Sequence, residues 1–163
     1  MTALEVLGVS FSDRLDFSEH FRVVCARASR SIALKVLKAH GLLGANLWQV
    51  CRATTISYLT YAAPAWWGYT DACSRLRLQA VINRLRRFGF LPPEFPTHEE
   101  LCEHMCGELF RQVLHNNFHV LHQLLPPEKV TPYALRPSAH HRIIPRADNK
   151  FRRNFIIRML YRP

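Results

Sequence analysis

The sequence has few acidic residues, and this deficit sets its most distinctive property. Only 12 Asp and Glu stand against 22 Lys and Arg, which gives a formal net charge of +10. Nucleic acid is the commonest partner of so basic a surface, and an anionic membrane surface is the second. The alternative is a basic surface that serves only solubility.

Long apolar runs are also missing. No stretch approaches the ~18 consecutive apolar residues of a membrane helix, and residues 1–9 lack the basic start and apolar run of a signal peptide. The cysteines are five, an odd number that does not suit a secreted disulfide framework. We therefore expect an intracellular protein, nuclear or cytoplasmic, that has reduced thiols and no membrane partner; its oligomeric state is left open.

The motifs of catalytic sites are absent from the sequence as well. It has only six glycines, none of them in a phosphate-binding loop, and it has no Gly-x-Ser-x-Gly motif. Nucleotidyl transfer needs paired carboxylates to hold Mg²⁺, whereas Asp13, Asp16, Asp71 and Asp148 are each isolated. We therefore expect no catalytic residue and no cofactor in this chain.

Two groups of histidine and cysteine have helical spacing but do not predict a metal site. His98 and Cys106, with Cys102 between them, lie about 12 Å apart along a helix, which is too far for one tetrahedral zinc ion. The second group is His115, His119 and His122. No further Cys or His pair has zinc-finger spacing, so we expect no metal.

The chain is predicted to be mainly α, with a short N-terminal strand. Residues 4–11 alternate and predict one strand, and because the first thirty residues offer it no partner, we expect the partner upstream. A first helix should begin at the Ser18 cap and stop at Gly41. Its apolar stripe is Phe21, Val24, Cys25, Ala28, Ile32 and Val36. Leu34 and Leu37 lie off this stripe, so either the second half is buried on two sides or the helical phase slips.

Three further helices are predicted. The second runs from Asn46 through Tyr58, and Pro64 should end or kink it. The third spans about 71–88 with a stripe at Leu78, Val81, Ile82, Leu85 and Phe88. A capping box at 97–100 opens the fourth, whose apolar pattern continues to about 127 with Gly107 as a possible hinge. Beyond residue 128, prolines interrupt a basic arm that contains a short amphipathic turn at about 151–160.

Basic residues on the third helix and in the C-terminal arm are the candidate nucleic-acid contacts, because arginine binds phosphate. They are Arg75, Arg77, Arg84, Arg87, Arg136, Arg142, Arg146, Arg152 and Arg153. Trp66, Trp67 and Tyr69 offer rings on which bases stack. Core packing is the alternative for the tryptophans, and it is favoured because small alanines flank them. A solvated face is the alternative for the arginine helix.

Four segments together resemble one family. They are residues 7–20 (LGVSFSDRLDFSEH), 51–68 (CRATTISYLTYAAPAWWG), 119–127 (HVLHQLLPP) and 154–161 (NFIIRMLY). In their order and spacing they resemble the C-terminal part of the reverse transcriptase of non-LTR (LINE-type) retrotransposons. The resemblance extends over nearly the whole chain.

The resemblance implies a division of the chain. Residues 1–16 would end the palm, with Leu7, Gly8 and Val9 matching the primer grip. Residues 17–91 would form thumb-like helices, 92–127 a helical post-thumb segment and 128–163 a basic tail. In this family the polymerase aspartates, which hold Mg²⁺, and the endonuclease precede the primer grip. We therefore expect no enzymatic activity from this chain alone.

The function implied is that of a fragment of an RNA-directed DNA polymerase that retains template–primer binding. One departure is that the family has one more residue after the position of Ile32, and a one-residue deletion turns a helix by about 100°. This suggests a degenerate copy of the transposable element. An inert pseudogene product and a helical protein-interaction module are therefore the alternatives, and a preference for RNA or DNA is left open.

Overall fold

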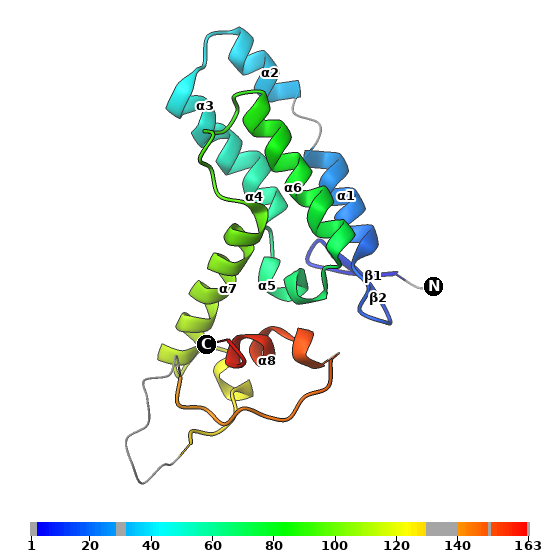
Figure 1. Ribbon diagram of the computed structural model, residues 1–163, viewed down its shortest axis with the longest axis vertical. Helices are drawn as coiled ribbons and strands as arrows, with labels where there is room; N and C mark the ends of the chain where they lie inside the picture. Colours follow the sequence, from blue (N-terminus) through cyan, green and yellow to red (C-terminus); the bar gives the residue numbers. More distant parts are fainter. Residues whose placement is uncertain (1–2, 29–31, 130–139, 150, 163) are drawn as a thin grey trace. The chain divides into compact units, whose positions relative to one another are not determined.

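The computed structural model describes residues 3–28, 32–129, 140–149 and 151–162. The fold is mainly α with a short N-terminal antiparallel sheet, which confirms the predicted fold class (Figure 1). The chain forms two compact units, residues 1–102 and 103–163.

The N-terminal segment is a hairpin, so the expectation of one strand paired with an upstream segment was wrong. Strand β1 (Ala3–Val6) pairs with β2 (Val9–Ser12), and Val6 faces Val9 across the turn. The two turn residues both have positive φ, 49° at Leu7 and 79° at Gly8, as in the tight turns that suit the twist of a hairpin. Leucine rarely has a positive φ. The alternating pattern therefore gave no indication of a turn at Leu7.

The helix expected over residues 18–40 is two helices, α1 (Ser18–Ala28) and α2 (Ile32–Ala39). Helix α1 buries Phe21 and Val24, as its stripe predicted. In α2 the buried face changes: Leu34 is 3% exposed, whereas Ile32 and Val36, which continued the stripe, are 69% and 49% exposed. The sequence left open whether the second half is buried on two sides or the helical phase slips, and the structure shows that the phase slips.

The second predicted helix is a composite. It consists of α3 (Gly44–Cys51), a π-helical turn (Arg52–Ile56) and α4 (Ser57–Leu59). Pro64 does not end it; this proline lies in the first turn of the short α5 (Ala63–Trp66), where it costs no hydrogen bond. Helix α6 (Ala72–Arg87) matches the third predicted helix, with Asp71 as its N-cap.

The first unit packs around the inner face of α6. Helix α1 contacts α6, α4 and β2, while α2 contacts α3 (Figure 1). The largest side chains that are almost fully buried here are Trp66, Trp67, Phe90, Leu47, Leu59, Leu78, Ile82, Leu85 and Leu91. Each such side chain contributes roughly 1.5–3 kcal/mol by leaving water. This packing fixes one face of α6 inward and leaves the other in solvent.

Helix α7 (His98–His115) begins at the predicted capping box. The Thr97 backbone N–H donates to Glu100 Oε2 at 2.7 Å, and the Glu100 N–H donates to Thr97 Oγ1 at 3.2 Å. The helix runs through Gly107 without a hinge and ends at His115, so its expected continuation to residue 127 was wrong. The Asn116 side chain accepts the N–H of Phe118 at 3.0 Å, a local bond that competes with helix propagation.

The second unit is less regular beyond α7. It contains 3₁₀ turns at His122–Leu124 and Phe151–Arg153, and the helix α8 (Phe155–Leu160). Asn154 caps α8 by accepting the N–H of Ile156 at 3.1 Å. The apolar face of α8 is buried at Ile156, Ile157, Met159 and Leu160. No helix in the described ranges is both long enough and apolar enough to cross a membrane.

Candidate nucleic-acid interface

The candidate interface begins with the outer face of α6. Asp71 holds the start of the helix by accepting the Ser74 N–H at 2.6 Å, and the inward stripe of Leu78, Ile82 and Leu85 fixes its rotation. The arginines at positions 77, 84 and 87 are consequently exposed on the other side. We call Arg77, Arg84 and Arg87 the arginine face.

Two lysines from α2 join the end of this face. Lys38 Nζ donates a hydrogen bond of 2.7 Å to the carbonyl oxygen of Phe88, the C-cap of α6. Lys35 Nζ lies 5.4 Å from the centroid of the Phe88 ring, and the guanidinium of Arg87 lies 5.5 Å from it. Lys35 and Arg87 thus lie against a ring that is still 37% exposed. We call Lys35, Lys38, Arg87 and Phe88 the Phe88 cluster.

The positive charge of the Phe88 cluster is not balanced by acidic side chains. Within the described part of the chain, no carboxylate lies within ion-pair distance of Lys35, Lys38, Arg84 or Arg87. The C-terminal end of α6 carries only a partial negative charge, about half an elementary charge. The cluster therefore has net positive charge beside an exposed aromatic ring, which is the combination that binds the phosphates and bases of nucleic acid.

Sequence reasoning did not find Lys35 and Lys38. Their proximity to α6 depends on the contact of α2 with Phe88, 50 residues later in the chain. The only signal in the sequence was their own spacing at i and i+3 on α2, which puts both on one helix face.

Two other arginines of α6 have intramolecular partners. Arg75 forms an ion pair of 3.2 Å with Glu99, and its guanidinium lies 4.3 Å from the centroid of Trp67. Arg86 donates to the backbone oxygen of Phe95. Of the sequence-predicted candidates on α6, Arg75 is thus the one already engaged by the protein itself.

The tryptophans lie in the core, as the favoured interpretation predicted. Trp66 and Trp67 are each 1% exposed, and the buried ring of His98 lies 6.1 Å and 5.6 Å from them. Burial lowers the pKa of His98, which favours the neutral ring. These tryptophans therefore present no face to a nucleic-acid base; Tyr69 is half-buried beside Phe17, with ring centroids 5.5 Å apart.

The residues compared with a primer grip form the tip of the hairpin. Leu7 has a left-handed backbone conformation and is 85% exposed, while Val9 is buried. The Tyr61 hydroxyl donates to the Leu7 carbonyl at 3.0 Å, so the tip is tied to the segment before α5. A large apolar residue that is exposed and held in a strained conformation is a feature of functional sites.

Candidate arginines of the second unit differ in their exposure and in the contacts that they make within the protein. Arg142 is mostly buried and contacts Glu128 at 3.4 Å and the Pro126 oxygen at 3.1 Å. Arg152 donates to the Ala147 oxygen at 3.0 Å and lies over the ring of Tyr161. Arg146 and Arg153 are exposed. Arg136 lies outside the described residues.

The histidines and cysteines considered as metal ligands bond mainly to other groups. His98 Nε2 lies 3.3 Å from the Leu59 oxygen, and Cys106 Sγ is 3.1 Å from the Arg158 guanidinium. His115 Nδ1 and His122 Nδ1 each lie 2.8 Å from a backbone oxygen. In the ranges that the structure describes, no three His, Cys, Asp or Glu side chains are grouped as metal ligands would be.

Comparison with known proteins gives no relative. No protein-family model matches the chain, and neither a curated protein nor a solved structure matches it.

Proposed function

We propose that this chain is a nucleic-acid-binding fragment of a non-LTR retrotransposon RNA-directed DNA polymerase, and that it holds the backbone of a template–primer duplex without catalysing synthesis itself. The observation that carries the proposal is the Phe88 cluster. Lys35, Lys38 and Arg87 converge there from two helices, and no acidic side chain among the described residues pairs with them.

The arginine face extends this positive surface along α6. Arg84 and Arg87 are three residues apart, and Arg77 lies two helical turns before Arg84, so the three lie on one side of the helix. A row of fixed cations of this kind neutralises successive phosphates and reads no base sequence. It suits a polymerase thumb, which must hold a duplex of any sequence.

The resemblance and the hairpin add support. Of the residues that resemble a primer grip, Leu7 and Gly8 form an exposed turn and Val9 is buried at the start of β2. The helices that would form the thumb follow in the same compact unit. In the family that the sequence resembles, the aspartates and Mg²⁺ belong to the palm that precedes the primer grip. This chain would contribute binding alone.

The test is a titration of the chain with a fluorescently labelled RNA–DNA primer duplex, read by anisotropy at 50 to 200 mM salt. Phosphate contacts release counterions, and log K should fall linearly with log salt by roughly 0.9 per contact. The five cations of the arginine face and the Phe88 cluster would give a slope of about −4 to −5 by the same rule. An unrelated duplex of equal length should bind equally. Absence of binding at the lowest salt, or binding that ignores salt, would refute the proposal.

A further inference from the structure

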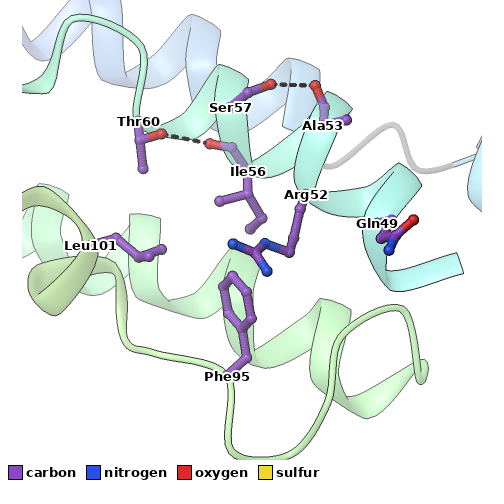
Figure 2. Close-up of a pocket in the computed structure, with 8 residues that line it drawn as sticks. All are labelled: Gln49, Arg52, Ala53, Ile56, Ser57, Thr60, Phe95 and Leu101. Carbon is purple, nitrogen blue, oxygen red and sulfur yellow. Dashed lines mark hydrogen bonds between the residues drawn. The ribbon is translucent and has the colours of Figure 1, made fainter. Parts of the chain in front are cut away.

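A hollow of about 410 Å³ opens on the first unit beside the π-helical turn Arg52–Ile56 (Figure 2). Ile56, Phe95 and Leu101 give it an apolar wall. Its polar residues are Gln49, Arg52, Ser57 and Thr60. Its volume lies within the range of small-ligand sites, about 300–1,000 Å³. It is therefore large enough for one nucleotide-sized group.

Among the described residues that line the hollow, Arg52 is the one that carries a charge. The hydroxyl groups that line it bond back to their own helix: Ser57 Oγ donates to the Ala53 oxygen at 2.6 Å, and Thr60 Oγ1 donates to the Ile56 oxygen at 2.9 Å (Figure 2). Their donor capacity is thus already used. π-Helical turns are rare inside α-helices and occur frequently at functional sites.

The guanidinium of Arg52, by contrast, is available to bind a ligand. It points into the hollow between Ile56 and Phe95 (Figure 2). In the described part of the chain no carboxylate lies within ion-pair distance of it, in contrast to Arg22 and Arg111, which pair with Glu19 and Glu108. A guanidinium is always charged, and its planar fork binds phosphate through two parallel hydrogen bonds.

We propose that this hollow receives one unpaired nucleotide of a nucleic-acid strand, with its phosphate on Arg52 and its base against Ile56, Phe95 and Leu101. The proposal rests on the proposed function, since it assumes that the chain binds nucleic acid. It adds a site for a single-stranded residue to a surface that otherwise holds duplex backbone. The pairing of one cation with an apolar wall matches the two parts of a nucleotide, the charged phosphate and the flat base.

The experiment compares a blunt RNA–DNA duplex with the same duplex carrying a one-nucleotide single-stranded overhang. Wild-type protein should bind the overhang duplex roughly five- to tenfold more tightly, in the range expected for one base contact. Arg52→Gln keeps a polar side chain, though a shorter one, and removes its charge; it should abolish this preference while blunt-duplex affinity falls less than twofold. Ala53→Glu, which places a carboxylate on the rim at an exposed position, should abolish the preference too.

The controls separate this inference from the proposed function. Arg22→Gln removes an exposed arginine that is already ion-paired and should leave the preference intact. An abasic overhang keeps the phosphate and should lose most of the preference. Equal binding of blunt and overhang duplexes by wild type, or an unchanged preference in Arg52→Gln, would overturn the inference that the hollow binds a nucleotide. The proposed function would not be affected by either result. Failure of wild type to bind either duplex would overturn both proposals.

Discussion

The ammonium nitrogen of Lys38 lies 2.7 Å from the carbonyl oxygen of Phe88 and donates a hydrogen bond to it. The last carbonyls of an α-helix lack partners within the helix, so Lys38 supplies one of the bonds missing at the C-terminal end of α6. The same bond holds a cation of α2 beside the arginine face. One contact therefore serves both the fold and the charge distribution of the candidate interface.

Replacing Lys38 by Met should lower the free energy of unfolding of the first unit by about 1 kcal/mol, the usual net contribution of one hydrogen bond. Lys35→Met is the matched control because Lys35 offers the Phe88 ring only a cation–π contact, a weaker interaction at an exposed site. Urea unfolding followed by circular dichroism measures both variants. Equal losses of unfolding free energy in the two variants would show that the hydrogen bond from Lys38 to Phe88 stabilises the first unit no more than the Lys35 contact does.

Tyr61→Phe should loosen the hairpin tip. The lost hydroxyl is the donor to the Leu7 carbonyl, and we expect a loss of about 1 kcal/mol together with faster amide hydrogen exchange in residues 3–12. Tyr58→Phe is the control, since its hydroxyl accepts from Arg27 Nη1 at 3.1 Å instead. If both variants gave wild-type exchange in residues 3–12, the tie between Tyr61 and the tip would be unimportant.

The sequence predicted the elements whose signals are local. Helix α6 was predictable because Asp71 caps it and its stripe is continuous, and α7 because Thr97 and Glu100 form a capping box. The early end of α7 also had a local signal in the consecutive Asn116 and Asn117, which the longer apolar pattern outweighed. Local hydrogen bonding by asparagine competes with a helix even where apolar periodicity continues.

The remaining features depend on contacts distant in sequence. The hairpin was missed because Leu7 has positive φ, a conformation that no pattern in an alternating strand indicates. The arginine face was predictable from α6 alone, whereas the Phe88 cluster required knowing that Lys35 and Lys38 lie beside Phe88. The π-helical turn at Arg52–Ile56 likewise leaves no mark in the apolar spacing.

The stability of the first unit should fall as the pH drops below about 6.5. Burial lowers the pKa of both His98 and His20 from the ordinary value of 6.5. The unfolded chain therefore binds more protons than the folded chain in the window just below this value, and stability rises with pH there by at most about 1.4 kcal/mol per pH unit for each histidine.

Urea unfolding at intervals between pH 5 and 7.5 measures this dependence. His98→Gln removes one of the two buried rings and should reduce the slope, although the variant is expected to be less stable at every pH because its site is almost fully buried. A wild-type stability that is flat over this range, or an unchanged slope in His98→Gln, would contradict the assignment of neutral buried rings.

The most direct test of the central claim is the salt dependence of duplex binding by the double variant Arg84→Ala/Arg87→Ala. Both side chains are exposed, and the unfolding free energy should change by no more than about 0.5 kcal/mol for each. The control is Arg22→Ala/Arg111→Ala, which removes two exposed arginines that are ion-paired with glutamates. Affinity for an RNA–DNA primer duplex should fall in the first variant alone, and its slope of log K against log salt should shrink by roughly two. A folded Arg84→Ala/Arg87→Ala variant with wild-type affinity and wild-type slope would contradict the claim that the arginine face binds nucleic acid.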